Sequence, residues 1–290
     1  MDYTFIYQVK QFINEIEKLK TDHRAALPKF LKPFHFATLA AYCRKSNTKL
    51  DLNHEALSYA VRMGLFEAID QEPPVTVNRH SQNGNLIEAT AVVCEDTIHK
   101  SSINISEMFA NCAKDKETIS SIEIMMAELL GNCVHHSTDG SDTPFGLVCG
   151  QAWQNGGIAQ ICIADKGIGI RESLAGNPEL QARLESSNSC EMACEYGITG
   201  KPLGNHSGYG LAVAKGLAKN FDGKLLVVSG HEIHAASKNQ EKSSVMDCPW
   251  DGTFIIFEWN LNIPLNVTSV YDTFPTSDTL SEDDLYDIFS

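Results

Sequence analysis

Three polar residues with a regular spacing could share one chemical task. Glu128, Asn132 and His136 recur at every fourth position, so a helix would carry them as one polar stripe. A carboxylate such as that of Glu128 can accept a proton from an attacking hydroxyl. One turn further on, the carbonyl oxygen of Asn132 can bind Mg²⁺. Taken alone, however, the same stripe is more typical of a solvated helix edge.

A second group of residues follows a strand predicted over residues 158–164. Asp165 stands at the end of this strand, where its carboxylate could accept a hydrogen bond from an exocyclic amine such as that of adenine. Gly167 and Gly169 would let the backbone approach a ligand closely. An ordinary turn that contains Asp and Gly is the alternative interpretation.

A third group precedes a helix predicted over residues 211–221. Gly208, Tyr209, Gly210 and Leu211 lead into this helix, whose first N–H groups and positive dipole end could bind phosphates. Other nucleotide motifs are absent from the sequence. It contains no G-x-x-x-x-G-K-[ST] loop, and Val213 replaces the third glycine of a dinucleotide fingerprint.

Hydrophobic periodicity indicates the elements that must position these residues. The stretch 145–164 predicts two strands joined by a hairpin turn at Asn155, Gly156 and Gly157. Up to about residue 100, short strands and helices mix, and the fold class is α+β. Predicted helices cover residues 5–19, 117–136 and 211–221, and predicted strands cover residues 145–153, 158–164, 224–229 and 253–259.

The charge balance narrows the class of binding partner. The 290 residues have a formal net charge of −14, which disfavours binding to nucleic acids and to anionic membrane surfaces. Residues 266–290 predict an acidic tail that docks on a partner or on the body of the protein. Six carboxylates fall in its stretch from Tyr271 to Ser290, which has no Lys or Arg.

The cysteines and the apolar runs indicate a cytoplasmic protein. None of the nine cysteines has C-x-x-C spacing, and most lie in apolar runs, so we expect reduced, buried thiols. The N-terminus has no signal-peptide pattern, and no apolar run approaches the roughly 20 residues of a membrane-spanning helix.

Taken in order, the three groups resemble the GHKL superfamily, named for gyrase, the ninety-kilodalton heat-shock chaperone, histidine kinases and the mismatch-repair ATPase. The resemblance covers about residues 117–261, and Gly252-Thr253 before a late strand matches a fourth feature of the family. It implies the Bergerat fold, a sandwich in which helices cover one face of a mixed sheet. It also implies binding of ATP with Mg²⁺.

The resemblance also implies a role for each matching position. Glu128 would be the general base, Asn132 the Mg²⁺ ligand and Asp165 the residue that binds adenine. Residues 171–207 would form a lid over the nucleotide. The remaining implied binding residues are Gly167 and Gly169 around adenine, Thr253 supporting Asp165 through water, Lys201 and His206 on the lid, and Gly208, Tyr209, Gly210 and Leu211 at the phosphates.

Within the superfamily, the E-x-x-x-N-x-x-x-H form is similar to the anti-sigma-factor type of serine kinase. Asp22-His23-Arg24 lacks the context of a phosphoacceptor histidine, which disfavours a histidine kinase. The resemblance therefore implies transfer of the γ-phosphoryl group to Ser or Thr of a protein partner. Two alternatives stay open: a slow ATPase that switches conformation, and a nucleotide sensor without turnover.

The N-terminal third carries a looser resemblance. FHFATLAAYCRK and SYAVRMGLF resemble the STAS-like region that precedes such ATP-binding domains, which implies regulation in cis or recruitment of a STAS-type partner. A layer that merely packs on the ATP-binding domain is the alternative, and assembly as a homodimer is left open. The expected organisation is an N-terminal helix (1–30), a small mixed α/β domain (31–112), the ATP-binding domain (113–265) and the acidic tail (266–290).

Overall fold

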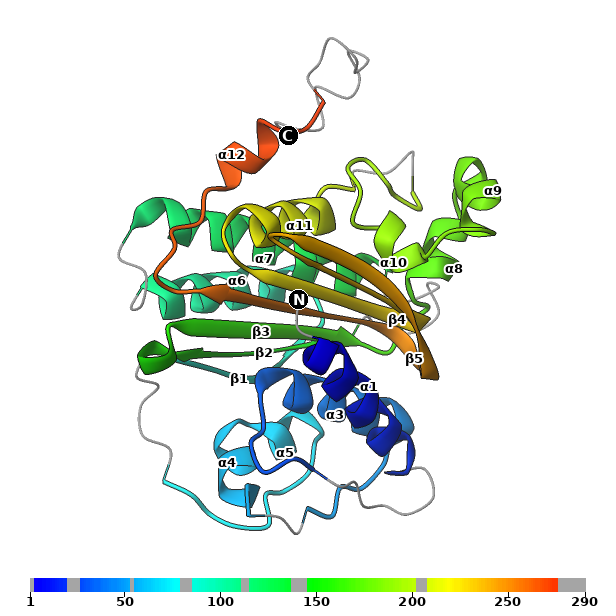
Figure 1. The fold of residues 1–290 in the computed structure, drawn as a ribbon. Coiled ribbons are helices and arrows are strands. Elements are labelled where there is room, and N and C mark those ends of the chain that lie inside the picture. Colours follow the sequence, from blue (N-terminus) through cyan, green and yellow to red (C-terminus); the bar gives the residue numbers. More distant parts are fainter. Residues whose placement is uncertain are drawn as a thin grey trace.

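The centre of the molecule is a five-stranded sheet with the order β1-β2-β3-β5-β4 (Figure 1). The computed structural model describes residues 3–19, 27–52, 55–78, 85–110, 115–136, 145–201 and 208–275. The strands are β1 (Leu86–Val92), β2 (Gly146–Trp153), β3 (Ile158–Asp165), β4 (Lys224–Ser237) and β5 (Gln240–Asn260). With helices on both faces, the fold is α+β, as the sequence predicts.

The sheet is antiparallel throughout the described residues, so the expectation of a mixed sheet is wrong. Two helices lie between β1 and β2 in the chain, and the chain enters β2 in the direction opposite to that of β1. The described chain from β3 to β4 passes through five helical segments and enters β4 in the direction of β3. However, β5 lies between these two strands, so they never pair.

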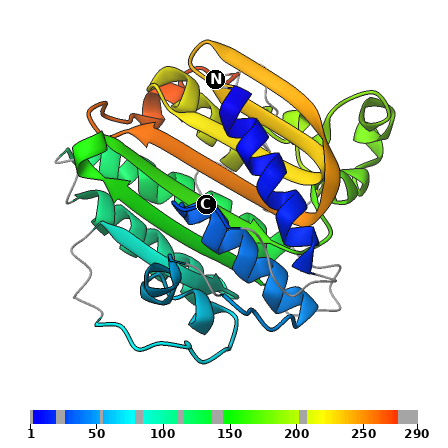
Figure 2. The same cartoon turned by 60° about the horizontal axis from the view of Figure 1, so that its bottom comes forward.

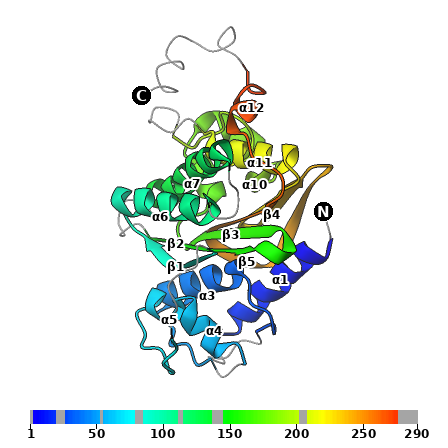
Figure 3. The ribbon, with the colours of Figure 1, turned by 90° about the vertical axis from the view of Figure 1, so that its left-hand side faces the viewer.

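One face of the sheet is covered by α6 (Glu95–Ala110), α7 (Lys116–His136) and α11 (Gly210–Asn220) (Figure 3). The apolar stripe predicted for residues 117–136 is confirmed, because Met125, Met126 and Leu129 are fully buried against the sheet. This face also carries the lid region, with α8 (Ile170–Ala175), η2 (Pro178–Leu180), α9 (Gln181–Leu184) and α10 (Ser189–Met192).

The N-terminal helices cover the opposite face (Figure 2). Helices α1 (Tyr3–Glu17) and α3 (Pro33–Ser46) lie across the strands, and α4 (Leu57–Arg62) and α5 (Leu65–Ala68) complete this layer. The described part of residues 31–112 contributes one strand, β1, and that strand pairs with β2. Within the described residues, this stretch therefore shares the central sheet and packs on its face, and the resemblance to a STAS-like region stays a prediction.

Strand alternation decides which layer each side chain meets. On β3, Ala159, Ile161 and Ile163 pack toward α7 and α11, whereas Cys162 and Ala164 pack toward the N-terminal layer. Successive side chains on a strand point to opposite faces. Asp165 consequently faces the same layer as Ile163, on the side of α7.

Smaller features complete the fold. The β2–β3 turn contains η1 (Gln154–Gly156) and a positive φ at Gly157, as expected for a hairpin. The polar stretch before residue 253 is part of the sheet, because β4 and β5 continue through it as a long hairpin.

The eight cysteines in the described ranges are free thiols, six of them buried, whereas Cys112 lies outside those ranges. Within the same ranges no helix has the length and apolarity to cross a membrane.

Replacement of Phe34 by Ala should destabilise the whole protein, because this side chain fills the core between the N-terminal layer and the sheet. Phe34 is 1% exposed and packs edge-on against Phe5 and Phe12. We expect the free energy of unfolding to fall by about 3 kcal/mol or more. Denaturant unfolding would measure it, with Phe30→Ala as the matched control, since Phe30 is 60% exposed. Equal effects of the two substitutions would contradict the role of this layer.

Candidate functional site

A cavity of about 440 Å³ opens between α7, the start of α11, the end of β3, the middle of β5 and the segment predicted to form a lid. Most of the site residues predicted from the sequence line it, although they come from four separate parts of the chain. The predicted residues in its wall are Glu128, Asn132, Asp165, Gly169, Gly208, Tyr209, Gly210, Leu211 and Thr253.

Asp165 supplies a buried carboxylate with one oxygen already bound. Its Oδ1 accepts hydrogen bonds from the amides of Gly167 (2.8 Å) and Thr253 (3.1 Å). Within the described residues, no hydrogen bond reaches Oδ2. Burial raises the pKa of Asp165 to about 6, against the opposing effects of the two amides and of Lys166. A ligand that donates a hydrogen bond to this carboxylate would offset the cost of its burial.

The position of Asp165 depends on a close approach between two backbone segments. Gly252 has a φ of +95°, and a Cβ atom there would lie 2.5 Å from the carbonyl oxygen of Asp165. Ser229 ties the segments together, because its hydroxyl donates to the carbonyl of Gly252 (2.7 Å) and accepts from the amide of Ile170 (2.8 Å). The loop after β3 and the middle of β5 are thereby held together.

Helix α11 begins at the cavity without a side-chain cap. Tyr209 occupies the N-cap position and makes no capping hydrogen bond. No hydrogen bond within the described residues engages the amides of Gly210, Leu211 and Ala212, the first of the helix. Free amides at the positive end of a helix dipole form a binding site for anions when they face a cavity.

The same helix start packs directly against the polar stripe of α7. A Cβ atom at position 210 would lie 2.9 Å from the Cβ atom of Glu128 and 3.6 Å from Nδ2 of Asn132. Only glycine fits there, so Gly210 brings the carboxylate and the amide beside the free N–H groups. Glu128 and Asn132 offer two oxygen ligands to a cation, and Mg²⁺ takes few protein ligands when phosphates supply others.

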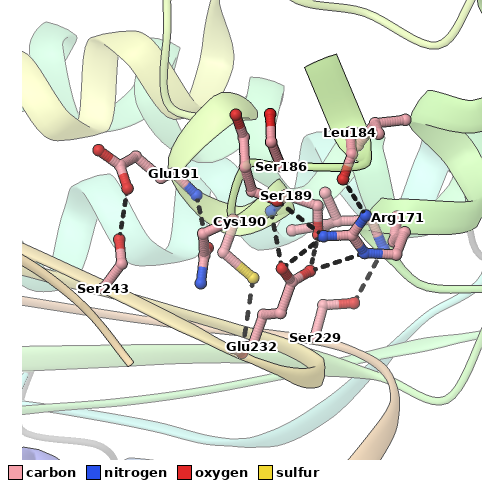
Figure 4. Close-up of polar contacts among 12 residues, drawn as sticks. Arg171, Leu184, Ser186, Ser189, Cys190, Glu191, Ser229, Glu232 and Ser243 are labelled. Atoms are coloured by element: carbon pink, nitrogen blue, oxygen red, sulfur yellow. Dashed lines mark hydrogen bonds and ion pairs between the residues drawn. The ribbon is translucent and has the colours of Figure 1, made fainter. Parts of the chain in front are cut away.

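The base of the lid is pinned to the sheet by one ionic cluster (Figure 4). Arg171 forms two hydrogen bonds with Glu232 of β4 (2.6 and 3.1 Å) and also donates to the carbonyls of Leu184 and Ser187. Ser189 donates to Glu232 through both its amide and its hydroxyl. Burial alone would raise the pKa of Glu232, but the bonds from Arg171 and Ser189 lower it below its ordinary value. The start of the predicted lid is therefore fixed to β4 through Glu232.

Two predicted residues do not line the cavity, and a third lies outside the described residues. Gly167 does not line the cavity, and it acts instead through the amide that holds Asp165. Lys201 is exposed at the end of a described range, and the cavity wall does not include it. His206 lies outside the described residues. Thr253 donates a direct hydrogen bond from its backbone amide to Asp165, and the expected support through water stays a prediction.

Several residues on which the site depends carry no signal in the sequence. Ser229 stands at the end of a predicted strand. Trp250, which donates its indole N–H to the carbonyl oxygen of Asp165 (3.0 Å), lies between two predicted strands. Tyr196 and Phe274 lie against Tyr209 of the cavity wall and come from separate segments. Trp250 could have been identified from the sequence if the long β4–β5 hairpin had been predicted. The contacts among the aromatic rings arise only in the folded chain.

No protein-family model matches the chain, and no curated protein matches it either. The geometry of the cavity is therefore the basis for a functional assignment.

Substitution of Asp165 by Asn should stabilise the protein at neutral pH. The folded-state pKa is raised, so the stabilising contribution of Asp165 is complete below its ordinary pKa and is lost as the pH rises through about 6. Asn keeps an oxygen for the two amides and removes the buried charge. We expect a gain in unfolding free energy of at most about 3 kcal/mol at pH 8, because one pKa unit corresponds to about 1.4 kcal/mol.

Denaturant unfolding of both proteins at pH 5 and pH 8 would measure this difference. The gain should shrink toward pH 5, and Asp272→Asn, at an exposed position, should show neither effect. A loss of stability in Asp165→Asn at pH 8 would contradict the description of this carboxylate.

The Arg171–Glu232 pair should stabilise the root of the lid in a pH-dependent way. A double-mutant cycle with Arg171→Met and Glu232→Gln should give a coupling of about 1 kcal/mol, modest because Arg171 is half exposed. The pKa of Glu232 is lowered, so the coupling should be present above the ordinary value of 4.5 and disappear as the pH falls below it. The exposed pair Arg183–Glu195 serves as the control and should couple more weakly.

Proposed function

We propose that the chain is a Mg²⁺-dependent ATP-binding regulatory protein of the GHKL type, which transfers the γ-phosphoryl group of ATP to Ser or Thr of a protein partner. One observation carries the proposal: a single cavity combines the open oxygen of a buried carboxylate, Asp165, with the uncapped start of α11. The first feature suits the exocyclic amine of adenine, and the second suits phosphates.

The lining of the cavity supports a purine base beside Asp165. Ile163, Ile170 and Ile255 supply apolar surface, and Gly169 leaves room for close approach. Buried polar groups that a ligand must satisfy discriminate strongly between ligands, because a ligand without the matching donor leaves them unpaired. The site would therefore bind adenine, which offers an amine donor at this point, more tightly than a base that offers a carbonyl there.

At the phosphate end of the cavity, the residues of α7 and those of α11 would have different roles. The amides of Gly210 and Leu211 would hold phosphate oxygens, and Asn132 would hold Mg²⁺, which neutralises charge between the phosphates when bound. Glu128 would accept the proton of the attacking hydroxyl. Since Gly210 packs on Glu128, the base and the phosphate-binding amides are positioned by one contact.

The acceptor and the cellular setting are proposals of the same kind. A protein hydroxyl is the favoured acceptor because the E-x-x-x-N form is similar to that of serine kinases. STAS-type regulatory proteins are the first partners to test. Free, buried thiols suit the reducing cytoplasm, where ATP is also available.

Binding and turnover of Mg·ATP by the purified full chain test the proposal. Asp165→Asn should weaken Mg·ATP binding at least 10-fold in calorimetry, because an amide in place of the carboxylate offers a worse partner to the amine of adenine. The wild-type affinity should also fall as the pH drops below about 6, where Asp165 becomes protonated. Glu128→Ala should abolish turnover and spare binding, since Glu128 acts only on the nucleophile.

The fate of the γ-phosphate distinguishes the three activities. With γ-labelled ATP, label on an added STAS-type protein supports a kinase, free phosphate supports an ATPase, and binding without either supports a sensor. Exposed Asp272→Asn is the matched control for the carboxylate substitution. If Asp165→Asn left the affinity for Mg·ATP untouched, the assignment of the cavity would be wrong.

A further inference from the structure

An aromatic cluster lies beside the cavity and includes one residue of its wall, Tyr209. Tyr196 from the lid stacks on Tyr209 at the start of α11, with ring centroids 4.6 Å apart and planes inclined by 18°. Phe274, from the segment after β5, lies 4.5 Å from the ring of Tyr196 and 6.4 Å from that of Tyr209. Two segments 13 residues apart in the sequence therefore meet a third that lies 65 residues further on.

Phe274 is held in place by a firmly anchored segment. Helix α12 (Val267–Tyr271) is tied to α7, since Thr118 accepts a hydrogen bond from the amide of Leu265 (2.8 Å) and Ser121 accepts one from that of Val267 (2.9 Å). Val270 is fully buried, so close to Gly216 of α11 that a Cβ atom there would lie 2.4 Å from its methyl group. The turn that ends α12 then brings Phe274 to the cluster.

The segment also contributes a second aromatic side chain beside Phe274. Partial burial raises the pKa of Tyr271, and the charge of Glu128 raises it further. Tyr271 in turn packs edge-on against Phe274, with centroids 5.8 Å apart. Residues 266–275 of the predicted tail therefore pack on α7 and α11, whereas residues 276–290 lie outside the described ranges.

On the other side of the cluster, Ile198 and Gly200 of the predicted lid pack closely against their neighbours. A Cβ atom at Gly208 would lie 2.7 Å from the carbonyl oxygen of Ile198, and one at Gly200 would lie 2.0 Å from that of Ser173. Ile198 can therefore shift only if Gly208 shifts with it. Tyr196 and Tyr209 connect the two through their rings and a hydroxyl contact of 3.3 Å.

We infer that Tyr196, Tyr209 and Phe274 form an aromatic clasp that positions the phosphate-binding start of α11. Phe274 is a positioning residue, because it acts through Tyr209 on the amides of Gly210 and Leu211 and does not line the cavity itself. The inference rests on the proposed function in that it assigns these amides to phosphates. It adds that the C-terminal segment controls affinity for the phosphates and not for the base.

The experiment compares ligands with and without phosphates on the full chain. In calorimetry, Phe274→Ala should weaken binding of Mg·ATP about 10-fold and leave the affinity for adenosine unchanged. Phe274→Tyr, which keeps the ring, should restore the wild-type value. Phe30→Ala is the matched control, because Phe30 is an exposed aromatic residue packed on Trp153, at the far end of the sheet from Asp165.

A second measurement needs no ligand. Trypsin cleavage after Arg183 reports on the lid, because Arg183 pairs with Glu195 next to Tyr196. Phe274→Ala and Tyr196→Ala should each accelerate this cleavage several-fold, and the double variant should add little to either, since the clasp acts as one unit. Phe274→Tyr should resist cleavage like the wild type.

The outcomes separate the clasp from the proposed function. Loss of both Mg·ATP and adenosine binding in Asp165→Asn, together with selective loss of Mg·ATP binding in Phe274→Ala, supports both. Equal losses for the two ligands in Phe274→Ala, or no loss, overturn the clasp and leave the nucleotide site standing. If the wild type bound neither ligand, the proposed function would fail, and unchanged cleavage in Phe274→Ala would overturn the clasp as well.

Discussion

Both faces of the central strands β3 and β5 are apolar, and each face must therefore be shielded from water by its own layer. An antiparallel sheet often leaves one face to solvent, but here Cys162, Ala164 and Ile256 on one side are as buried as Ile161, Ile163 and Phe257 on the other. Helices α7 and α11 cover the second set, and α1 and α3 cover the first. The N-terminal third is consequently part of the same folding unit as the candidate site, because without it one face of the sheet would be exposed.

The same alternation connects the site to the layer behind it. Asp165 faces the cavity, whereas the side chain of its neighbour Lys166 is buried toward the N-terminal layer, 4.2 Å from the ring of Trp250 and 5.4 Å from that of Tyr42 on α3. Trp250 also donates to the carbonyl oxygen of Asp165. A cation over an aromatic face contributes about 0.5–2 kcal/mol. Two consecutive residues thus fix one short loop between the layers, and a movement of α3 would be transmitted to the carboxylate in the cavity.

The sequence predicts those features of the fold and the site that depend on local patterns of residues. The helix over 117–136, the strands around 145–165, and the order Glu128, Asn132, Asp165, Gly208, Gly210 and Thr253 follow from periodicity and from the chemistry of single residues, and these side chains do line one cavity. Residues such as Ser229 and Phe274 could not be found this way, because their importance comes from segments that approach only in the folded chain. The extension of β5 through residues 240–252 was concealed because only Met246 and Trp250 have deeply buried side chains in that stretch. The mixed sheet was a wrong expectation because β5 inserts between two strands of equal direction.

That insertion has a consequence for the order of folding. Strand β5 is the last strand in the chain, yet it lies between β3 and β4, and its pairing with β3 joins residues about 95 positions apart, such as Ala164 and Phe254. Contacts of such sequence separation form late, because the entropy of closing the intervening chain must be overcome first. Asp165 receives the amide of Thr253 only when this step is complete. The hairpin of β2 and β3 can form early and locally, but the carboxylate site should mature with the slowest event of folding, so that a partly folded chain would hold no competent binding site.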